Sequence, residues 1–311
     1  MSSQPIICLG SAVWDTIFQV DAIPAAGVKV LPTRAVQAAS GMAASAAVTI
    51  ARLGGSVEFW SRVGVDDTGR RYIHDFQQDG VNTDWLRPIE GTTTPFSSII
   101  VDRFGERAVI PFYDPNIPVD PSWLPLDRVA QAGAVLVDVR WMEGAAALLQ
   151  EAQRWGVPAI LDADTAPVEV LNALVPLATH ELFSEPALQI YCPHESADAA
   201  LSNVASQHDF AVVGVTQGPL GAALWTRESG SVLHIPAPSI TPVDTLNAGD
   251  VWHGTFAWGL VQQWPIESIV QWANLAAAMK CEVFGGRLGA PTLAELTSRA
   301  NTLGFAPGNT A

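Results

Sequence analysis

The chain has 311 residues, of which 49% are hydrophobic and 15% charged, so it can bury one large core, and its formal net charge is −15. This acidic balance argues against nucleic acid or anionic membranes as partners, because both require clustered Lys and Arg. No apolar run is long enough to span a membrane, no basic segment leads into a signal-peptide core, and three widely spaced cysteines do not suit a disulfide framework, so we expect a cytoplasmic protein.

Short apolar segments that run into polar residues predict the parallel strands of an α/β sheet. They lie at 5–10, 57–63, 134–139, 159–164, 181–186 and 211–215. Helices expected at 144–155 and 168–177 supply the alternation of a doubly wound sheet. Since open α/β sheets bind ligands at the carboxyl ends of their strands, polar residues there, such as Asp15 and Arg140, are candidates for a site.

A second, smaller sheet is predicted from two other stretches. Residues 16–36 alternate polar and apolar side chains and are broken by Pro24, Gly27 and Pro32, as edge strands are. Segments 98–101 and 107–111, joined by the turn Asp102–Gly105, predict a β-hairpin.

Small residues and glycines mark two places where a ligand could approach the backbone. Residues 39–47 (ASGMAASAA), with Gly41 and Ser45, run into a helix that Gly54 ends. Later, the turn 216–221 (TQGPLG) leaves a strand and could pass close to phosphates, although a plain turn explains it equally well. The predicted helix 266–281 and the glycine-rich stop after it are also compatible with simple packing.

The segment Thr241–Phe256 (TPVDTLNAGDVWHGTF) joins a turn-forming run to an apolar helix. A helix that opens on small residues leaves backbone N–H groups unpaired at the positive end of its dipole, which predicts an anion site at the amides of Ala248, Gly249 and Asp250. Asp250, in the first turn, would repel a phosphate but could accept the proton of a hydroxyl that attacks it. Taken alone, the segment also fits an ordinary helix cap.

DTLNAGD, followed by a helix with Gly254, resembles the signature DTxGAGDxFxG of the ribokinase-like (PfkB) sugar kinases, and residues 62–69 (RVGVDDTG) resemble their RVGxDxxG turn. Similar segments occur in the family's order along almost the whole chain. The resemblance implies one ribokinase-like domain over residues 1–311, with a doubly wound, mostly parallel sheet flanked by helices. It also implies a small β-sheet lid, with strands at about 13–37 and 95–113, which would exclude water from the site.

The resemblance implies an ATP-dependent kinase that transfers the γ-phosphate to a primary hydroxyl of a ketose or related sugar, with Mg²⁺ as cofactor and a monovalent cation such as K⁺ as an option. Its catalytic residues would be Asp250, Gly249, Ala248 and Asn247. Its sugar site would contain Asp15, Gly27, Gly41, Ser45 and Arg140. Its nucleotide site would contain Ser184, Thr216, Gly218, Gly221, Asn274 and Gly286, and Glu185 would serve the metal.

VDVRW, LDADTAP, LFSEPAL, VTQG and KCEVFGGR are most similar to the 6-deoxy-6-sulfofructose kinases, in which an arginine in the VRW setting contacts the sulfonate. That role falls on Arg140. Pro111 replaces the asparagine that assists there, so another anionic or modified ketose stays an alternative. A structural ion pair with Asp162 or Asp164 is an alternative role for Arg140.

Several family positions are changed. Asn247 replaces a glycine, Ser45 replaces an asparagine, and Ser184 and Ala187 replace the ends of an NxxE motif. A sugar- or nucleotide-binding regulator with weakened transfer is therefore an alternative to the kinase. An NAD-binding Rossmann enzyme is disfavoured, because no G-x-G-x-x-G follows the first strand. The exposed lid sheet could also pair two copies of the chain into a homodimer.

Overall fold

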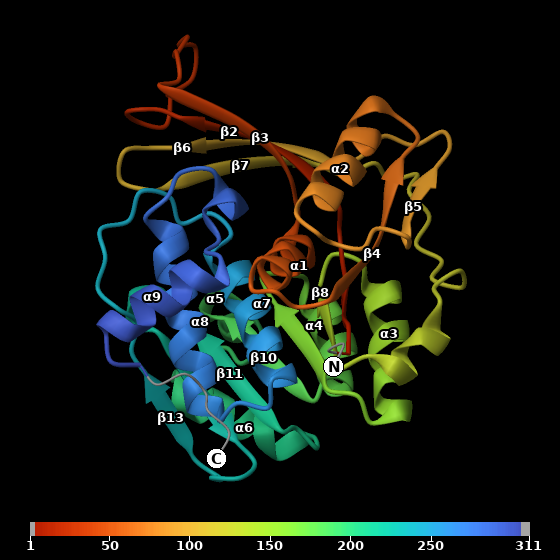
Figure 1. Cartoon of the computed structure of the whole chain (residues 1–311), viewed down its shortest axis with the longest axis vertical. Coiled ribbons are helices and arrows are strands. Elements are labelled where there is room, and N and C mark those ends of the chain that lie inside the picture. Colours follow the sequence, from red (N-terminus) through yellow and green to blue (C-terminus); the bar gives the residue numbers. More distant parts are fainter. Residues whose placement is uncertain (1–3, 306–311) are drawn as a thin grey trace.

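The computed structural model describes residues 4–305, and it places a large sheet between two layers of helices with a small sheet across one end (Figure 1). The order of the large sheet is β13-β12-β11-β10-β9-β8-β1-β4-β5. All its pairs are parallel except β11–β12 and β12–β13. Its strands are β1 (Ile6–Leu9), β4 (Val57–Gly64), β5 (Leu86–Ile89), β8 (Ala134–Asp138), β9 (Ala159–Ala163), β10 (His180–Ser184), β11 (Val212–Thr216), β12 (Ala222–Thr226) and β13 (Val232–Ile235).

The first strand shows how the sequence builds the layers. Side chains alternate along a strand, so Ile6 and Cys8 enter the core on one face, and Ile7 and Leu9 enter the core on the other. Because both faces are covered, the strand is continuously apolar. The predicted doubly wound, mostly parallel sheet is confirmed.

Helices cover both faces of the sheet. The first face carries α1 (Met42–Arg52), α2 (Asp67–Gln78), α7 (Ala248–Val261), α8 (Ile266–Cys281) and α9 (Leu293–Thr302). The second carries α3 (Met142–Trp155), α4 (Val168–Leu174), α5 (Glu185–Tyr191) and α6 (Ala197–Gln207). Short 3₁₀ turns are η1 (Leu126–Gln131), η2 (Val175–Leu177), η3 (Gly218–Leu220) and η4 (Gly286–Gly289). Among residues 4–305 no helix is long and apolar enough to cross a membrane.

Helix α7 is the central helix, and every residue from Asp250 to Gly259 is buried. It packs closely on α1, where a Cβ at Gly254 would lie 2.5 Å from the carbonyl oxygen of Ala46. This close approach gives a structural reason for the glycine of the motif. The buried helix holds its N-terminus rigidly at the end of the sheet.

The small sheet has the order β3-β2-β6-β7 and consists of β2 (Val13–Gln19), β3 (Arg34–Ser40), β6 (Phe96–Val101) and β7 (Arg107–Phe112). The predicted hairpin is present, but the strands expected within 16–36 are shorter. Residues 20–33 form a loop, since Pro24 and Pro32 cannot donate to a ladder. Beneath the sheet, Ile17, Ile99 and Val101 pack on Leu246 and Phe284, which joins the sheet to the loop before α7.

Candidate active site

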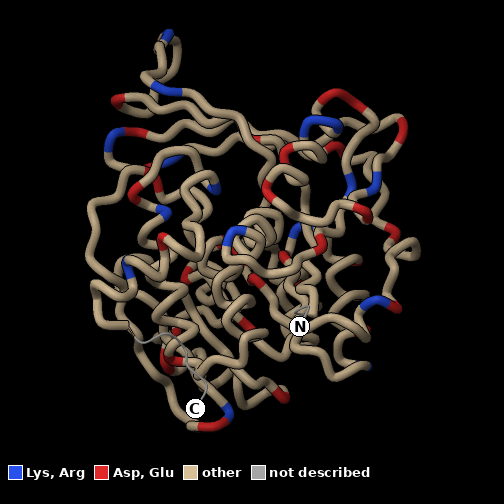
Figure 2. Tube along the Cα trace, viewed as in Figure 1, with Lys and Arg blue, Asp and Glu red and all other residues tan. Residues whose placement is uncertain are grey.

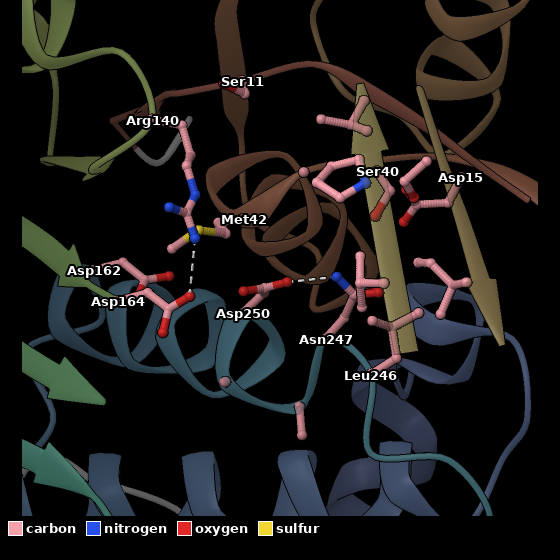
Figure 3. Close-up of a pocket in the computed structure, with 18 of the residues that line it drawn as sticks. Ser11, Asp15, Ser40, Met42, Arg140, Asp162, Asp164, Leu246, Asn247 and Asp250 are labelled. Atoms are coloured by element: carbon pink, nitrogen blue, oxygen red, sulfur yellow. Dashed lines mark hydrogen bonds and ion pairs between the residues drawn. The ribbon is translucent and has the colours of Figure 1, made fainter. Parts of the chain in front are cut away.

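A cavity of about 530 Å³ lies between the small sheet and the carboxyl ends of the parallel strands. It is lined by the ends of β9, β10 and β11, by Arg140 just after β8, and by the first turn of α7. Figure 3 shows the labelled side chains of Arg140, Asp164, Asp250 and Asn247 facing a common space. The cavity therefore lies where the sequence predicts a ligand site.

The first turn of α7 has the geometry of an anion site. Asn247 adopts the left-handed conformation (φ 61°), and the amide of Ala248 donates to the carbonyl of Thr245 at 3.3 Å. The amides of Gly249 and Asp250 donate to no acceptor within residues 4–305. Two of the three predicted amides are thus free, and the third is only weakly engaged.

The carboxylate of Asp250 lies beside these amides and is only 9% exposed. Burial, followed by the charge of Asp162, raises the pKa of Asp250 well above its usual value. Asn247 Nδ2 opposes this rise by donating to Asp250 Oδ2 at 2.6 Å (Figure 3). A carboxyl with a raised pKa is a better proton acceptor for a hydroxyl than an ordinary aspartate.

Two further carboxylates, which were not predicted as site residues, line the same cavity. Asp162 lies one residue before the end of β9, and its Oδ2 is buried without a hydrogen-bond partner among the described residues, 3.5 Å from His253 Nδ1. Asp164 accepts a hydrogen bond from Ser184 Oγ at 3.0 Å. The sequence feature that could have identified them as site residues is their position at the carboxyl end of a buried strand.

Arg140 reaches the cavity from the end of β8. Its Nη1 donates to the carbonyl of Thr165 at 2.9 Å, and its Nη2 lies 3.3 Å from Asp164 Oδ2. The ion pair considered as an alternative role is therefore present, with Asp164 as the partner. Since a guanidinium has five N–H donors, donors remain for a bound anion.

Asp15 lies on the side of the cavity away from Arg140 (Figure 3), and Gly41 also lines the cavity. Asp15 is buried and accepts a hydrogen bond from Ser97 Oγ at 2.5 Å; burial raises its pKa. Gly41 has φ 121°, and a Cβ there would lie 2.0 Å from the carbonyl oxygen of Ser11, so only glycine fits. Pro111 lines the same cavity from β7.

Gly27 and Ser45 do not reach the cavity, which corrects their predicted placement. Gly27 lies in the exposed loop 20–33, beyond the end of β2. Ser45 points into the packing around α1, where its hydroxyl is buried without a partner among the described residues. A small residue near a helix start does not by itself indicate which way the helix faces.

A second cavity, of about 340 Å³, meets the first at the start of α7. The residues that line both are Thr216, Gly218, Thr245, Ala248 and Gly249. Gly221 and Asn274, two of the residues predicted for a nucleotide site, line the second cavity alone. The Asn274 amide is already bonded, since its Oδ1 accepts from Trp252 Nε1 at 2.8 Å and its Nδ2 donates to the carbonyl of Ile235 at 2.9 Å. It therefore shapes the wall of the pocket.

Three predicted nucleotide or metal residues are placed elsewhere. Ser184 lines the first cavity, not the second, and also caps α5. Gly286 lines neither cavity, because its backbone packs against Asn247. Glu185 is exposed at the start of α5 and lines neither.

The carboxylates at the end of β9 fit a Mg²⁺ better than Glu185 does. Within residues 4–305 no group of three His, Cys, Asp or Glu side chains could hold a metal alone. Mg²⁺ bound with a nucleotide needs only one or two carboxylates, because phosphates and waters complete its shell. Asp162 and Asp164 both line the cavity and supply such groups.

Residues 3–293 match the model of the pfkB family of carbohydrate kinases. A ribokinase of Bacillus subtilis is 28% identical, with 94% of this chain and 97% of that protein covered, and a fructokinase of Vibrio alginolyticus is also 28% identical, over 82% and 89%. A crystal structure of an Agrobacterium tumefaciens protein assigned as a ribokinase is 38% identical, with a TM-score of 0.93 and coverage of 98% and 99%. The chain therefore belongs to the pfkB family of carbohydrate kinases, which are phosphotransferases with an alcohol group as acceptor.

Proposed function

We propose that this kinase transfers the γ-phosphate of ATP to a primary hydroxyl of a ketose or related sugar that carries an anionic group. The main support for this proposal is the buried Asp250 carboxylate, which lies beside two free amides at the junction of two cavities. One cavity is lined by acids and by two arginines, Arg107 and Arg140, and the other mostly by small and apolar residues. This pairing suits a polar acceptor on one side and a nucleotide on the other.

On the acceptor side, Asp15 and Arg140 lie at different parts of the cavity wall. A carboxylate accepts hydrogen bonds from sugar hydroxyls, whereas a guanidinium with spare N–H groups pairs with a sulfonate, carboxylate or phosphate. The side chain of Arg140 is 33% exposed, so an anion could reach it. A neutral ketose would bring no negatively charged group to pair with the Arg140 guanidinium.

On the donor side, ATP would lie across Thr216–Gly221 with its base against the wall that Asn274 holds. Asp162 and Asp164 would hold Mg²⁺ through its waters, and the metal would neutralise part of the phosphate charge. Asp164 accepts hydrogen bonds from both Arg140 and Ser184, and these two bonds keep its carboxylate in place. Family membership supports ATP as the donor.

In the transfer step, the sugar hydroxyl oxygen forms a bond to the γ-phosphorus while the bond from that phosphorus to the bridging oxygen of ADP breaks. The hydroxyl proton passes to Asp250. The amides of Gly249 and Asp250 face the place where negative charge develops on the phosphoryl oxygens, and they stabilise it. No covalent enzyme intermediate is required.

The test replaces Asp250 with asparagine and measures ADP release with a panel of neutral ketoses, sulfosugars and aldonates. Loss of the base should lower kcat by about 10²–10⁴-fold without loss of thermal stability. A turnover close to that of the wild type would refute the assignment. Arg140→Met is the companion variant, and it should raise KM for anionic sugars more than for neutral ketoses, because the loss of its bond to Asp164 acts on both classes of sugar alike.

One contact favours a second candidate, a sugar- or nucleotide-binding regulator. Asn247 Nδ2 already donates a hydrogen bond to Oδ2 of Asp250, the expected base, and the Asn247 side chain lines the cavity that the phosphate would enter. Such a protein would gain thermal stability with a sugar or ATP but release no ADP. The same panel, read by melting temperature and by ADP release together, separates the two functions.

The small sheet supports a proposed homodimer. β7 is its edge strand; Val109 and Pro111 line the cavity, while Ile110 and Phe112 are exposed. An exposed apolar edge strand is self-complementary, so a second copy is the expected partner. Light scattering should give a dimer that Ile110→Lys dissociates, and a wild-type monomer would exclude it.

The three cysteines are buried and free, which fits a protein that works in the reducing cytoplasm.

A further inference from the structure

A lysine ammonium is fully buried beside the start of α7. Lys280 is in the last turn of α8, and neither its side chain nor that of Asp244 is exposed. Lys280 Nζ donates to the carbonyl oxygen of Asp244 at 2.5 Å and lies 3.5 Å from Asp244 Oδ1. A lysine is almost never buried without a partner, and this one is paired with the aspartate that opens the DTLNAGD motif.

Asp244 connects two loops that shape the anion site. Its Oδ1 accepts from the amide of Leu246 at 2.8 Å, which fixes the turn into Asn247. Its Oδ2 accepts from the amides of Gly285 and Gly286 at 2.8 and 2.9 Å. The carboxylate therefore holds the loop before α7 against the loop after α8.

This arrangement does not fit a bound monovalent cation. A K⁺ ion would need oxygen ligands, but the first two residues of the glycine-rich loop turn their amides toward Asp244. The positive charge that Asp244 needs is already supplied by Lys280. A second cation at this carboxylate would be repelled by the ammonium and also by Arg107, whose charge acts on Lys280.

We propose that Lys280 is a built-in replacement for the monovalent cation, so that transfer by this kinase does not depend on K⁺. The inference rests on the proposed function. It makes Lys280 a positioning residue, which acts through Asp244 and the turn at Leu246 and touches no reacting atom. Its charge also balances that of Asp244, which would otherwise oppose a phosphate approaching the nearby helix N-terminus.

The first experiment uses the wild-type protein in KCl or choline chloride at equal ionic strength. We expect kcat, KM for ATP and melting temperature to be the same in both salts. A several-fold activation by K⁺, or a melting temperature raised by K⁺ alone, would overturn the proposal. If no sugar supports ADP release, the proposed function fails, while the melting temperatures still test whether K⁺ binds here.

The second experiment compares Lys280→Ala with Lys280→Met and with a matched control. Both variants remove the charge, but only alanine leaves room for an ion. We expect kcat to fall at least tenfold in both, and K⁺ to restore several-fold activity in the alanine variant only. Arg299→Met, which breaks the exposed pair between Arg299 and Glu282 near the same helix end, should match the wild type.

Wild-type kcat in Lys280→Met, or equal effects of K⁺ on the two Lys280 variants, would contradict the assignment. If neither variant folds, the salt comparison on the wild-type protein still decides it. The rescue by K⁺ distinguishes positioning from packing, because lost packing would not respond to the nature of the cation.

Discussion

Asn247 gives the sharpest test of how the site tunes its base. Its side chain donates to Asp250 Oδ2 at 2.6 Å, which lowers the pKa of a carboxyl that burial raises. Replacing Asn247 with glycine removes this donor, while glycine accepts φ 61° at no steric cost. The pKa of Asp250 should therefore rise further, and less of the base should be ionised at acidic pH.

The magnitude follows from the hydrogen bond. A bond to a charged group contributes about 1.5–3 kcal/mol, and a tenfold change in an equilibrium corresponds to about 1.4 kcal/mol. Asn247 borders the cavity, so water will replace part of the lost bond. We expect the acid limb of kcat/KM to move to higher pH by about 1, with activity below that limb reduced about tenfold.

The assay is ADP release between pH 5 and 9 with the best sugar from the panel. Gln263→Gly is the matched control, because Gln263 is also a left-handed residue (φ 57°), exposed just beyond the C-terminal end of α7. It carries the same backbone change far from the carboxylate and should leave the pH profile unchanged. An acid limb that stays in place or moves to lower pH in Asn247→Gly would refute the reasoning.

Three other predictions concern stability. Asn274→Ala should lower the free energy of unfolding by about 1–3 kcal/mol in urea titrations, because it leaves the buried Trp252 Nε1 without its acceptor; an unchanged midpoint would contradict this. Gly10→Ala should lower the melting temperature markedly, since its Cβ would lie 1.9 Å from Asp138 Oδ2. A melting temperature equal to that of the wild type would show that the backbone at residue 10 can shift without cost. Burial lowers the pKa of His180 to about 4, below its unfolded value, so its stabilising contribution is present above pH 6.5 and disappears as pH falls toward 4. That loss is about 3 kcal/mol at most, and His180→Gln should flatten the pH dependence of urea unfolding over this range; an equally steep dependence would exclude the assignment.

The sequence predicted the large sheet better than the small one. Buried parallel strands such as β1 are continuously apolar because both faces are covered, so their pattern is visible without a partner strand. In residues 16–36 the alternation continued past the end of β2 into the loop 20–33, and only Pro24, Gly27 and Pro32 indicated the break. Strand length there depends on pairing with β3 and β6, which local sequence does not encode.

For the candidate site, too, residues that are close in the sequence were predicted better than residues that only tertiary packing brings together. Asp250 and its neighbours lie on one short segment, so their spacing along the helix already predicted an amide site with a carboxylate beside it. Ser45 and Gly286 also carried suitable residue types, but their directions depend on how α1 and the loop after α8 pack. Asp162 and Asp164 became site residues only because strand order brings the end of β9 opposite the first turn of α7.

By itself, the sequence determined which segments are buried strands, where a helix opens on unpaired amides, and that an acid stands in its first turn. These are local properties of periodicity and residue size. Tertiary structure alone decided the rest: that Arg140 shares Asp164 with Ser184, and that Lys280 lies against Asp244, 36 positions away. Such pairs form where separate elements meet, and full burial strengthens the charges of the Lys280–Asp244 pair.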